Sequence, residues 1–290
     1  MRMSSLLFVF ALSFFVTFAN NEGTMAAERF NNASLKGNYA VFDIGRGGQS
    51  PQAGVSVTTY DGKGSFSGVT IQDVPGGTFR ERVFARASFR GTYNVGENGT
   101  GTGVITTTLP DGSTSDVNVA LVITRSAQIG DDTVAEEFSF MHEQLGSTTG
   151  ALLTLQASRL PDEGKFTNAS LRGEYAYTLL GHGGPLPQAG LGVMSYDGAG
   201  RFTGNATVNI PGAAWGDRSF VSAPFVRPYT VNADGTGTAT PPGESDIVFV
   251  ITKAAVVDGV KLGTEVFFIV RELNPSTGNL LTGVITRLSD

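Results

Sequence analysis

One module is written twice in this chain, and this duplication constrains the fold more than any other feature of the sequence. The segment FNNASLKGNYA at 30–40 returns as FTNASLRGEYA at 166–176. The copies begin and end in step, and a chain of this length buries enough surface to fold alone. The sequence therefore predicts two homologous domains, residues 28–160 and 161–290, which we call the first and the second copy.

The two copies differ in length at one place. The offset between matching positions is 136 as far as Gly99 and Gly235, and it falls to 128 at Val122 and Val250. The second copy has therefore lost eight residues from the stretch that corresponds to about 103–121 of the first.

Short strands joined by tight turns fill both copies. Asp61-Gly62 lies between two alternating stretches and is a hairpin signal, because these residues tolerate the positive φ of primed turns. The 39 glycines and 12 prolines favour turns over long helices. The expected exception is one helical turn at 32–35, with Asn32 as its cap.

The predicted fold is all-β, with two tandem antiparallel β-barrels of about eight strands each. Barrel closure is favoured because it leaves no sheet edge exposed. A pair of two-sheet β-sandwiches is the alternative architecture.

The composition excludes several kinds of chemistry. The chain has no cysteine, which removes disulfides, thiolate nucleophiles and cysteine-based zinc sites. Two histidines are too few for a centre built from several imidazoles, and we expect neither a metal nor a cofactor. A formal net charge of -6 without any basic run argues against nucleic acid as a partner.

Residues 1–27 have the layout of a secretory signal peptide. One arginine precedes an almost unbroken apolar run at 6–18, which is shorter than the roughly 20 residues of a membrane-spanning helix. Small residues offer cleavage after Ala19 or near Ala26 and Ala27. We therefore expect an exported mature chain, periplasmic or extracellular and of bacterial type, with no integral membrane segment.

Phenylalanine is the dominant aromatic residue, with 20 copies against one tryptophan. Such side chains pack a core, and they can also line a hollow barrel that takes up a small hydrophobic molecule. Seven of them fall on alternating strand positions and are the predicted ligand-binding residues: Phe66, Phe84, Phe89, Phe138, Phe202, Phe220 and Phe225. A small hydrophobic molecule is the expected partner, and no protein partner is indicated.

Four ionisable residues are candidates for acid–base or binding chemistry. His142 and His182 have no histidine counterpart in the other copy, so we interpret them as surface or loop residues. Glu137 and Glu265 match across the copies. Each is either an acid, a base or a ligand contact inside a barrel, or the outward, solvated residue of its strand, and the second interpretation is favoured.

Arg82 and Arg218 also match across the copies and lie among aromatic residues. They form either an anion-binding platform or a structural ion pair, and the ion pair is favoured. The sequence shows no nucleophile beside a histidine, so no catalytic residue is predicted.

The opening of each copy resembles the calycin superfamily, lipocalins especially. Those barrels begin with a helical turn and a Gly-x-Trp strand, and an arginine near the end of the last strand packs over the tryptophan. The corresponding segments here are LKGNY at 35–39 and LRGEY at 171–175, with tyrosine in place of tryptophan and no helix after the last strand. The resemblance implies two barrel-closing pairs: Tyr39 with Arg159, and Tyr175 with Arg287. The duplicated Gly-x-Tyr and Asp-Gly-x-Gly units are also similar to uncharacterised secreted repeat proteins of bacteria.

The predicted function is binding of a small apolar ligand inside one or both barrels, without catalysis. The first alternative is a structural or adhesive module whose barrels are filled. The second is a barrel-type isomerase or cyclase, which is disfavoured because no paired acid and base is visible. An interior cavity of about 300 Å³ or more favours ligand binding, whereas a packed interior beside an exposed apolar patch favours the interaction module.

Overall fold

In the computed structural model, both copies are built from antiparallel strands. The structure describes residues 30–46, 51–75, 81–108, 112–143, 152–182, 188–211, 216–239, 246–271 and 280–288. The predicted signal peptide and its cleavage positions lie outside these ranges, so they stay a prediction.

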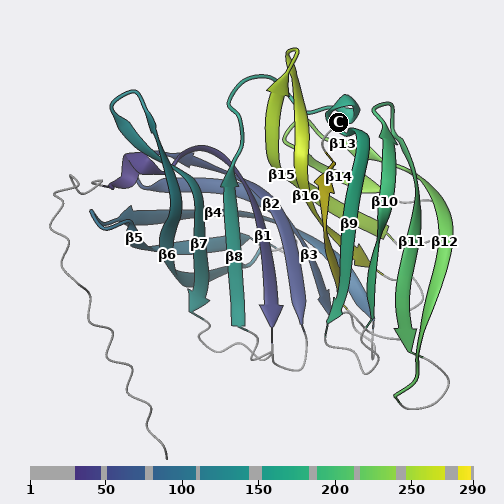
Figure 1. The fold of residues 1–290 in the computed structure, drawn as a ribbon. Coiled ribbons are helices and arrows are strands. Elements are labelled where there is room, and N and C mark those ends of the chain that lie inside the picture. The colour runs from purple at the N-terminus through teal and green to yellow at the C-terminus, as the bar shows by residue number, and fades with distance from the viewer. Residues whose placement is uncertain are drawn as a thin grey trace, which may run out of the picture.

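The first copy is a closed antiparallel barrel of eight strands, in which β1 pairs with both β2 and β8 (Figure 1). The 3-10 helix η1 (Asn32–Ser34) precedes the first strand. The strands are β1 (Lys36–Arg46), β2 (Gln52–Asp61), β3 (Ser65–Pro75), β4 (Arg82–Val95), β5 (Thr100–Thr108), β6 (Thr114–Ile129), β7 (Asp132–Glu143) and β8 (Leu152–Arg159). Closure gives every strand two neighbours, so this sheet has no free edge.

The second copy is a curled nine-stranded sheet in the order β12-β11-β10-β9-β17-β16-β15-β14-β13. It begins with the 3-10 helix η2 (Asn168–Ser170). The strands are β9 (Arg172–His182), β10 (Ala189–Asp197), β11 (Arg201–Pro211), β12 (Arg218–Pro228), β13 (Thr230–Val231), β14 (Thr236–Ala239), β15 (Asp246–Val257), β16 (Val260–Arg271) and β17 (Leu280–Arg287). The prediction of two tandem antiparallel barrel domains is confirmed, and the second barrel is open along β12.

The repeated opening segment closes one end of each barrel. Asn31 caps η1 by accepting a hydrogen bond from the backbone N–H of Ala33 at 2.8 Å, so the expected cap, Asn32, was wrong by one residue. The side chain of Asn32 instead accepts from the backbone N–H of Val95 at 2.8 Å. Leu35 follows and is fully buried in the barrel core.

The second copy repeats this closure. The Asn168 side chain accepts from the backbone N–H of Val231 at 2.8 Å, and the Tyr229 hydroxyl donates to the carbonyls of Asn168 at 2.9 Å and Leu171 at 2.8 Å. The first copy has the same three hydrogen bonds at the matching positions. The repeated motif is therefore an end plug of the barrel.

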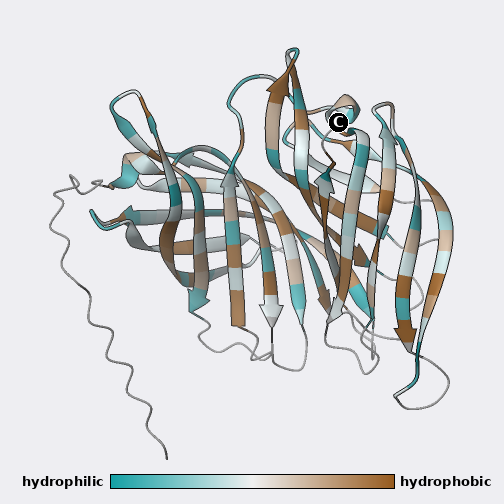
Figure 2. Ribbon diagram, in the orientation of Figure 1, coloured by the Kyte–Doolittle hydropathy of each residue, from teal (hydrophilic) through white to brown (hydrophobic). Residues whose placement is uncertain are grey.

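The two copies pack side by side through the outer faces of their sheets (Figure 1). Strands β1 and β2 of the first copy face β15, β16 and β17 of the second. The ring of Phe42 stacks on that of Phe267 with centroids 4.3 Å apart, and Ala40, Val250 and Ile269 are fully buried around it. Figure 2 shows that hydrophobic and hydrophilic residues are interspersed along these strands. At this interface the outer face is apolar, whereas Asp43, Ser56 and Thr58 place polar groups on the inner face of β1 and β2.

Replacing Leu35 with alanine tests the end plug. We expect a loss of about 2–5 kcal/mol in the free energy of unfolding, because the side chain is fully buried and its removal leaves a cavity. Denaturant unfolding followed by circular dichroism measures the change. Lys36→Ala at the exposed neighbouring position is the matched control and should stay within about 0.5 kcal/mol of the wild type. Equal effects of the two substitutions would contradict the plug.

Candidate functional site

The seven predicted phenylalanines divide into interior and outer-face residues. Four of them belong to the two interiors and are buried or half-buried: Phe66, Phe138, Phe202 and Phe225. Phe89 also packs against the first core. Phe84 and Phe220, by contrast, occupy outer faces. Phe84 packs against the second copy, where the Arg271 guanidinium lies 5.1 Å from its ring centroid, and Phe220 is 77% exposed.

The interior of the first barrel is largely filled. Tyr39 packs edge-on against Phe138 with centroids 5.2 Å apart, and Tyr60 stacks on Phe66 at 5.1 Å. The space left farther along the barrel has a volume of about 50 Å³. That is too small for the hydrophobic ligand that the sequence predicted.

The interior of the second copy holds a much larger apolar groove, of about 580 Å³. Four phenylalanines line it: Phe202, Phe225, Phe249 and Phe268. Aliphatic side chains and the rings of Tyr177 and Tyr196 also line it, and Arg227 is the one charged residue among the described residues of the lining. The volume lies within the range of about 300–1,000 Å³ that is typical of small-molecule sites.

Loss of strand pairing opens this groove along β12. In the first barrel, Ser88–Val95 of β4 pairs with β5 over its whole length. In the second copy the corresponding pairing is reduced to Thr230 and Val231, which form β13 and pair with β14. The sequence explains the difference, because six residues at 240–245 stand where the first copy has fourteen at 104–117. The alignment of the copies predicts this deletion but not its effect on closure.

Two prolines mark the open edge. Pro224 and Pro228 on β12 occupy the positions of Ser88 and Thr92, both of which pair with β5 in the first barrel. Proline has no backbone N–H to donate to a neighbouring strand, and it is found on edge strands for that reason. Along most of β12 the second copy therefore lacks the partner strand, and two of the donors with which β12 would bind one are missing.

The groove is also more apolar than the same positions of the first copy. Five interior positions are polar or charged in the first barrel and hydrophobic in the groove: Asp43/Leu179, Thr58/Met194, Thr70/Ala206, Gln72/Val208 and His142/Val270. These five differences and the two prolines are both visible in the sequence. Comparing the copies for differences as well as matches would have indicated an apolar, open interior in the second copy.

The predicted Tyr–Arg pairs lie side by side on neighbouring strands. Tyr39 is the cross-strand partner of Arg159, and Arg287 that of Tyr175. Gly37 beside the first pair has a φ of 104°, a backbone conformation that favours glycine. A cation–π contact within each pair stays a prediction.

Each of these tyrosines also ties its barrel together across the interior. The Tyr39 hydroxyl donates to the Ala135 carbonyl at 2.7 Å, and the Tyr175 hydroxyl donates to that of Gly263 at 2.9 Å. Burial raises the pKa of Tyr175 to about 12, so its hydroxyl stays protonated and remains a donor at neutral pH. This is a structural role.

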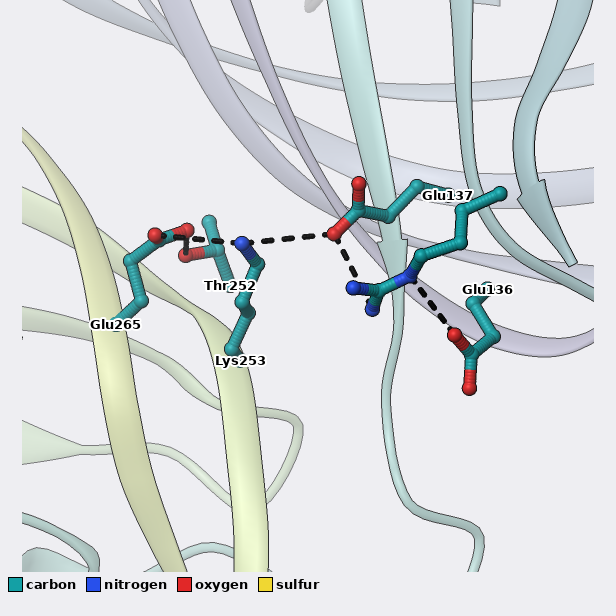
Figure 3. A network of polar contacts seen from close by, with 6 residues as sticks. Glu136, Glu137, Thr252, Lys253 and Glu265 are labelled. Carbon is teal, nitrogen blue, oxygen red and sulfur yellow. Dashed lines mark hydrogen bonds and ion pairs between the residues drawn. The ribbon is translucent and has the colours of Figure 1, made fainter. Parts of the chain in front are cut away.

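The two aligned glutamates meet across the junction of the copies (Figure 3). The Lys253 Nζ lies 3.5 Å from the Glu137 Oε1 and 3.5 Å from the Glu265 Oε2. Arg125 pairs with the Glu137 carboxylate at 3.3 Å, and the Thr252 hydroxyl donates to Glu265 at 2.9 Å. This network borders a space of about 420 Å³ between the copies. Arg125 also pairs with Glu136 at 2.8 Å, so three carboxylates share two cations, and the two contacts of Lys253 join the copies.

Arg82 is held in a buried ion pair, as the sequence favoured. Its Nε donates to the Asp73 carboxylate at 2.9 Å, and its Nη2 donates to the Pro51 carbonyl at 2.8 Å. Burial raises the pKa of Asp73 to about 6 although the Arg82 charge opposes this rise. Arg218 makes the corresponding bond to Asn209, at 2.6 Å.

The histidines are separated. His142 points into the first barrel rather than to the surface, and burial lowers its pKa to about 4. His182 ends β9, and its side chain lies outside the described part of the chain.

Comparisons with known proteins do not indicate a function, so the proposal below is based on the geometry of the site. No family model matches the chain, and a search of curated proteins finds no matching relative. In the described part of the chain, no helix is long and apolar enough to cross a membrane.

Restoring the two missing donors tests whether the prolines protect the edge of β12. For the double variant Pro224→Ser and Pro228→Thr we expect self-association roughly ten-fold tighter than in the wild type, or about 1.4 kcal/mol, because an unpaired strand with free N–H groups binds other edges. Sedimentation velocity over a concentration series measures it. Ser222→Thr on the same strand, which keeps its N–H, is the control. A double variant that sediments like the wild type would show that the prolines do not protect this edge.

Proposed function

We propose that this protein is an exported, non-catalytic binding protein that holds a small apolar molecule in the groove of its second copy. The observation that carries the proposal is the exposure of a barrel interior. Loss of the β5-like pairing opens a space of about 580 Å³ whose walls are mainly aromatic and aliphatic side chains. A fold that needed this face only for packing would keep it closed, because exposed apolar area costs free energy.

The two copies differ in how much space their interiors leave, and this difference supports the proposal. The first barrel is closed and nearly filled, with about 50 Å³ of interior space. It therefore serves as the scaffold, and its outer face supports β15, β16 and β17, which form one wall of the groove. The signal peptide expected at 1–27 would deliver this protein to the periplasm or the cell exterior, where an apolar molecule needs a carrier in water.

The aromatic walls indicate which kind of apolar molecule fits best. Phe202 and Phe225 meet edge-on with centroids 5.9 Å apart, and Tyr177 meets Phe225 at 6.2 Å. Rings in this arrangement offer both faces and edges to a planar guest, so we expect unsaturated or aromatic molecules to bind more tightly than saturated ones of the same size.

Groove residues exchanged for their first-copy counterparts test the proposal. The double variant Ala206→Thr and Val208→Gln places a hydroxyl and an amide in the apolar wall, where they lose water without gaining partners. We expect roughly ten-fold weaker binding of the uncharged fluorescent probe N-phenyl-1-naphthylamine, or about 1.4 kcal/mol. Leu191→Gln, on the outer face and 61% exposed, is the control and should bind the probe as the wild type does.

A chimaera provides the reciprocal test. Replacing 240–245 by the fourteen residues 104–117, together with Pro224→Ser and Pro228→Thr, restores the sequence that closes the first barrel. We expect a folded chimaera that no longer takes up the probe. Probe binding that survives in the chimaera, or is equal in the groove variant and the control, would overturn the proposal. Native mass spectrometry of protein from its own host would show whether a small molecule is retained.

The interaction module stays the second candidate, and one observation favours it. The outer face of β9 and β10 exposes Leu180, Leu191 and Val193 at 50%, 61% and 47%. These residues occupy the positions of Ile44, Val55 and Val57, through which the first copy holds the second. If this face binds a protein, Leu191→Gln will abolish that association while leaving probe binding unchanged, so the two candidates are distinguishable.

A further inference from the structure

A second, chemically different chamber lies inside the first barrel, at the end opposite the plug that η1 forms. Asp43 on β1, Gln72 on β3 and His142 on β7 line it together with Ser56, Thr70 and Thr107, and the lining also includes apolar side chains such as Phe140 and Leu155. We call it the polar chamber. Its volume is about 50 Å³, enough for a few atoms or water molecules.

The carboxyl group of Asp43 is buried with an oxygen left unsatisfied. Asp43 is 4% exposed, and its Oδ2 accepts no hydrogen bond from the described residues. Among the described residues that line the chamber there is no lysine or arginine to neutralise it. An uncompensated carboxylate in such a place is costly, and burial raises the pKa of Asp43 to about 7.

The neighbouring backbone is shaped around this side chain. Gly54 is the cross-strand partner of Asp43, and a Cβ at Gly54 would lie 2.2 Å from the Asp43 Oδ1. Any larger residue there would displace the carboxyl group from its position. Gln72 pairs with Gly54 on the next strand, so an amide and a carboxyl group flank the same glycine.

The fold does not require these polar groups. In the second copy Leu179, Val208 and Val270 occupy the positions of Asp43, Gln72 and His142, and β9 pairs with β10 there in the same register as β1 with β2. The imidazole of His142 likewise has a buried Nε2 with no hydrogen-bond partner among the described residues. Two buried, unsatisfied groups that point into one space are therefore better explained by a ligand than by packing.

We propose that the polar chamber binds a small organic cation, a protonated primary amine, with its ammonium group on the Asp43 carboxylate. An ammonium group offers three N–H donors and one positive charge. Asp43 accepts one donor and balances the charge, and the His142 Nε2 and the threonine hydroxyls accept the others. The described residues contain no cluster of three or more metal-ligating side chains, so the geometry favours an amine over a divalent ion.

This inference is independent of the apolar ligand proposed for the second copy, because the two sites lie in different barrels and the proposed amine depends on the carboxyl group of Asp43, which has no counterpart in the groove. Either can fail while the other stands.

Methylammonium chloride is the probe, and the Asp43 carboxyl carbon, labelled with ¹³C, is the reporter in NMR titrations of the full chain at pH 8. We expect a saturable shift of this resonance, and at least ten-fold weaker binding by calorimetry in Asp43→Asn, which keeps the shape and removes the charge. Asp116→Asn on β6, an exposed carboxylate, is the control and should bind as the wild type. Tetramethylammonium, which is larger and has no N–H, should not compete.

The affinity for methylammonium is also expected to depend on the ionisation of Asp43. Tyr60 and His142 are the other titratable side chains that line the chamber. Tyr60 stays neutral because burial raises its pKa, and His142 stays neutral above its lowered pKa of about 4. Affinity for methylammonium should therefore fall as the pH drops below about 7. No saturable shift in the wild type, or an affinity that is the same in Asp43→Asn or at pH 5, would overturn the proposal. If Asp43→Asn does not fold, the wild-type titration and its pH dependence decide.

The same carboxyl group makes a prediction for stability in the absence of ligand. Its pKa is raised from 3.8 to about 7 in the folded chain, so the folded state holds this proton more tightly than the unfolded state. The stability due to the protonated form is complete below pH 3.8 and is lost as the pH rises through about 7. Asp43→Asn should therefore melt higher than the wild type at pH 8 and near it at pH 4, as measured by calorimetry. Methylammonium should reduce the difference in melting temperature between Asp43→Asn and the wild type at pH 8.

Discussion

Pairing of β4 with β5 is the interaction on which the architecture of both copies depends. Where Ser88–Val95 pairs with a full-length neighbour, the sheet returns on itself, every strand has two partners, and the interior is filled apart from the polar chamber. Where the same stretch keeps only Thr230 and Val231 in register, the sheet curls without closing, and the interior becomes a groove. Backbone hydrogen bonds therefore decide whether phenylalanine side chains act as a core or as the wall of a cavity, although the residues themselves are nearly the same in both copies.

The duplicated sequence lets each copy serve as the reference for the other. The plug motif, the interior tyrosine bonded to a distant carbonyl, and the β-bulge on the sixth strand recur in both, so they belong to what the barrel needs to form. The interior beyond the plug differs: it is carboxyl, amide and imidazole in one copy, and leucine, valine and valine in the other. The sheet tolerates both linings, and such freedom is expected where side chains contact a ligand rather than determine the fold.

The outer faces of the two copies also differ at matching positions. Phe42 and Phe267 stack at the junction, and their counterparts in the faces that remain uncovered are Thr178 and Ser139. Polar residues have replaced the two rings where no sheet covers them, which limits head-to-tail growth of the kind that a repeated heterologous interface otherwise permits. Other apolar residues stay exposed on these faces: Leu180, Leu191 and Val193 on the second copy, and Val122, Met141 and Leu152 on the first.

The sequence by itself determined the duplication, the antiparallel strands, the turn positions and the missing eight residues, because these depend on local patterns: alternation, Asp-Gly turns and the match of one copy to the other. It also placed a helical turn at the start of each copy, one residue away from its true cap. It did not determine which phenylalanines face inward, since Phe84 and Phe220 occupy outer positions on strands whose alternation alone cannot distinguish the two faces. Nor did it show that Lys253 joins Glu137 to Glu265, or that Asp43 and His142 line one space, because these residues lie on strands far apart in the chain. Which side chains face an interior, and which of them lie near one another, was decided only by the tertiary structure. Closure of one sheet and opening of the other depend on all the strand pairings together.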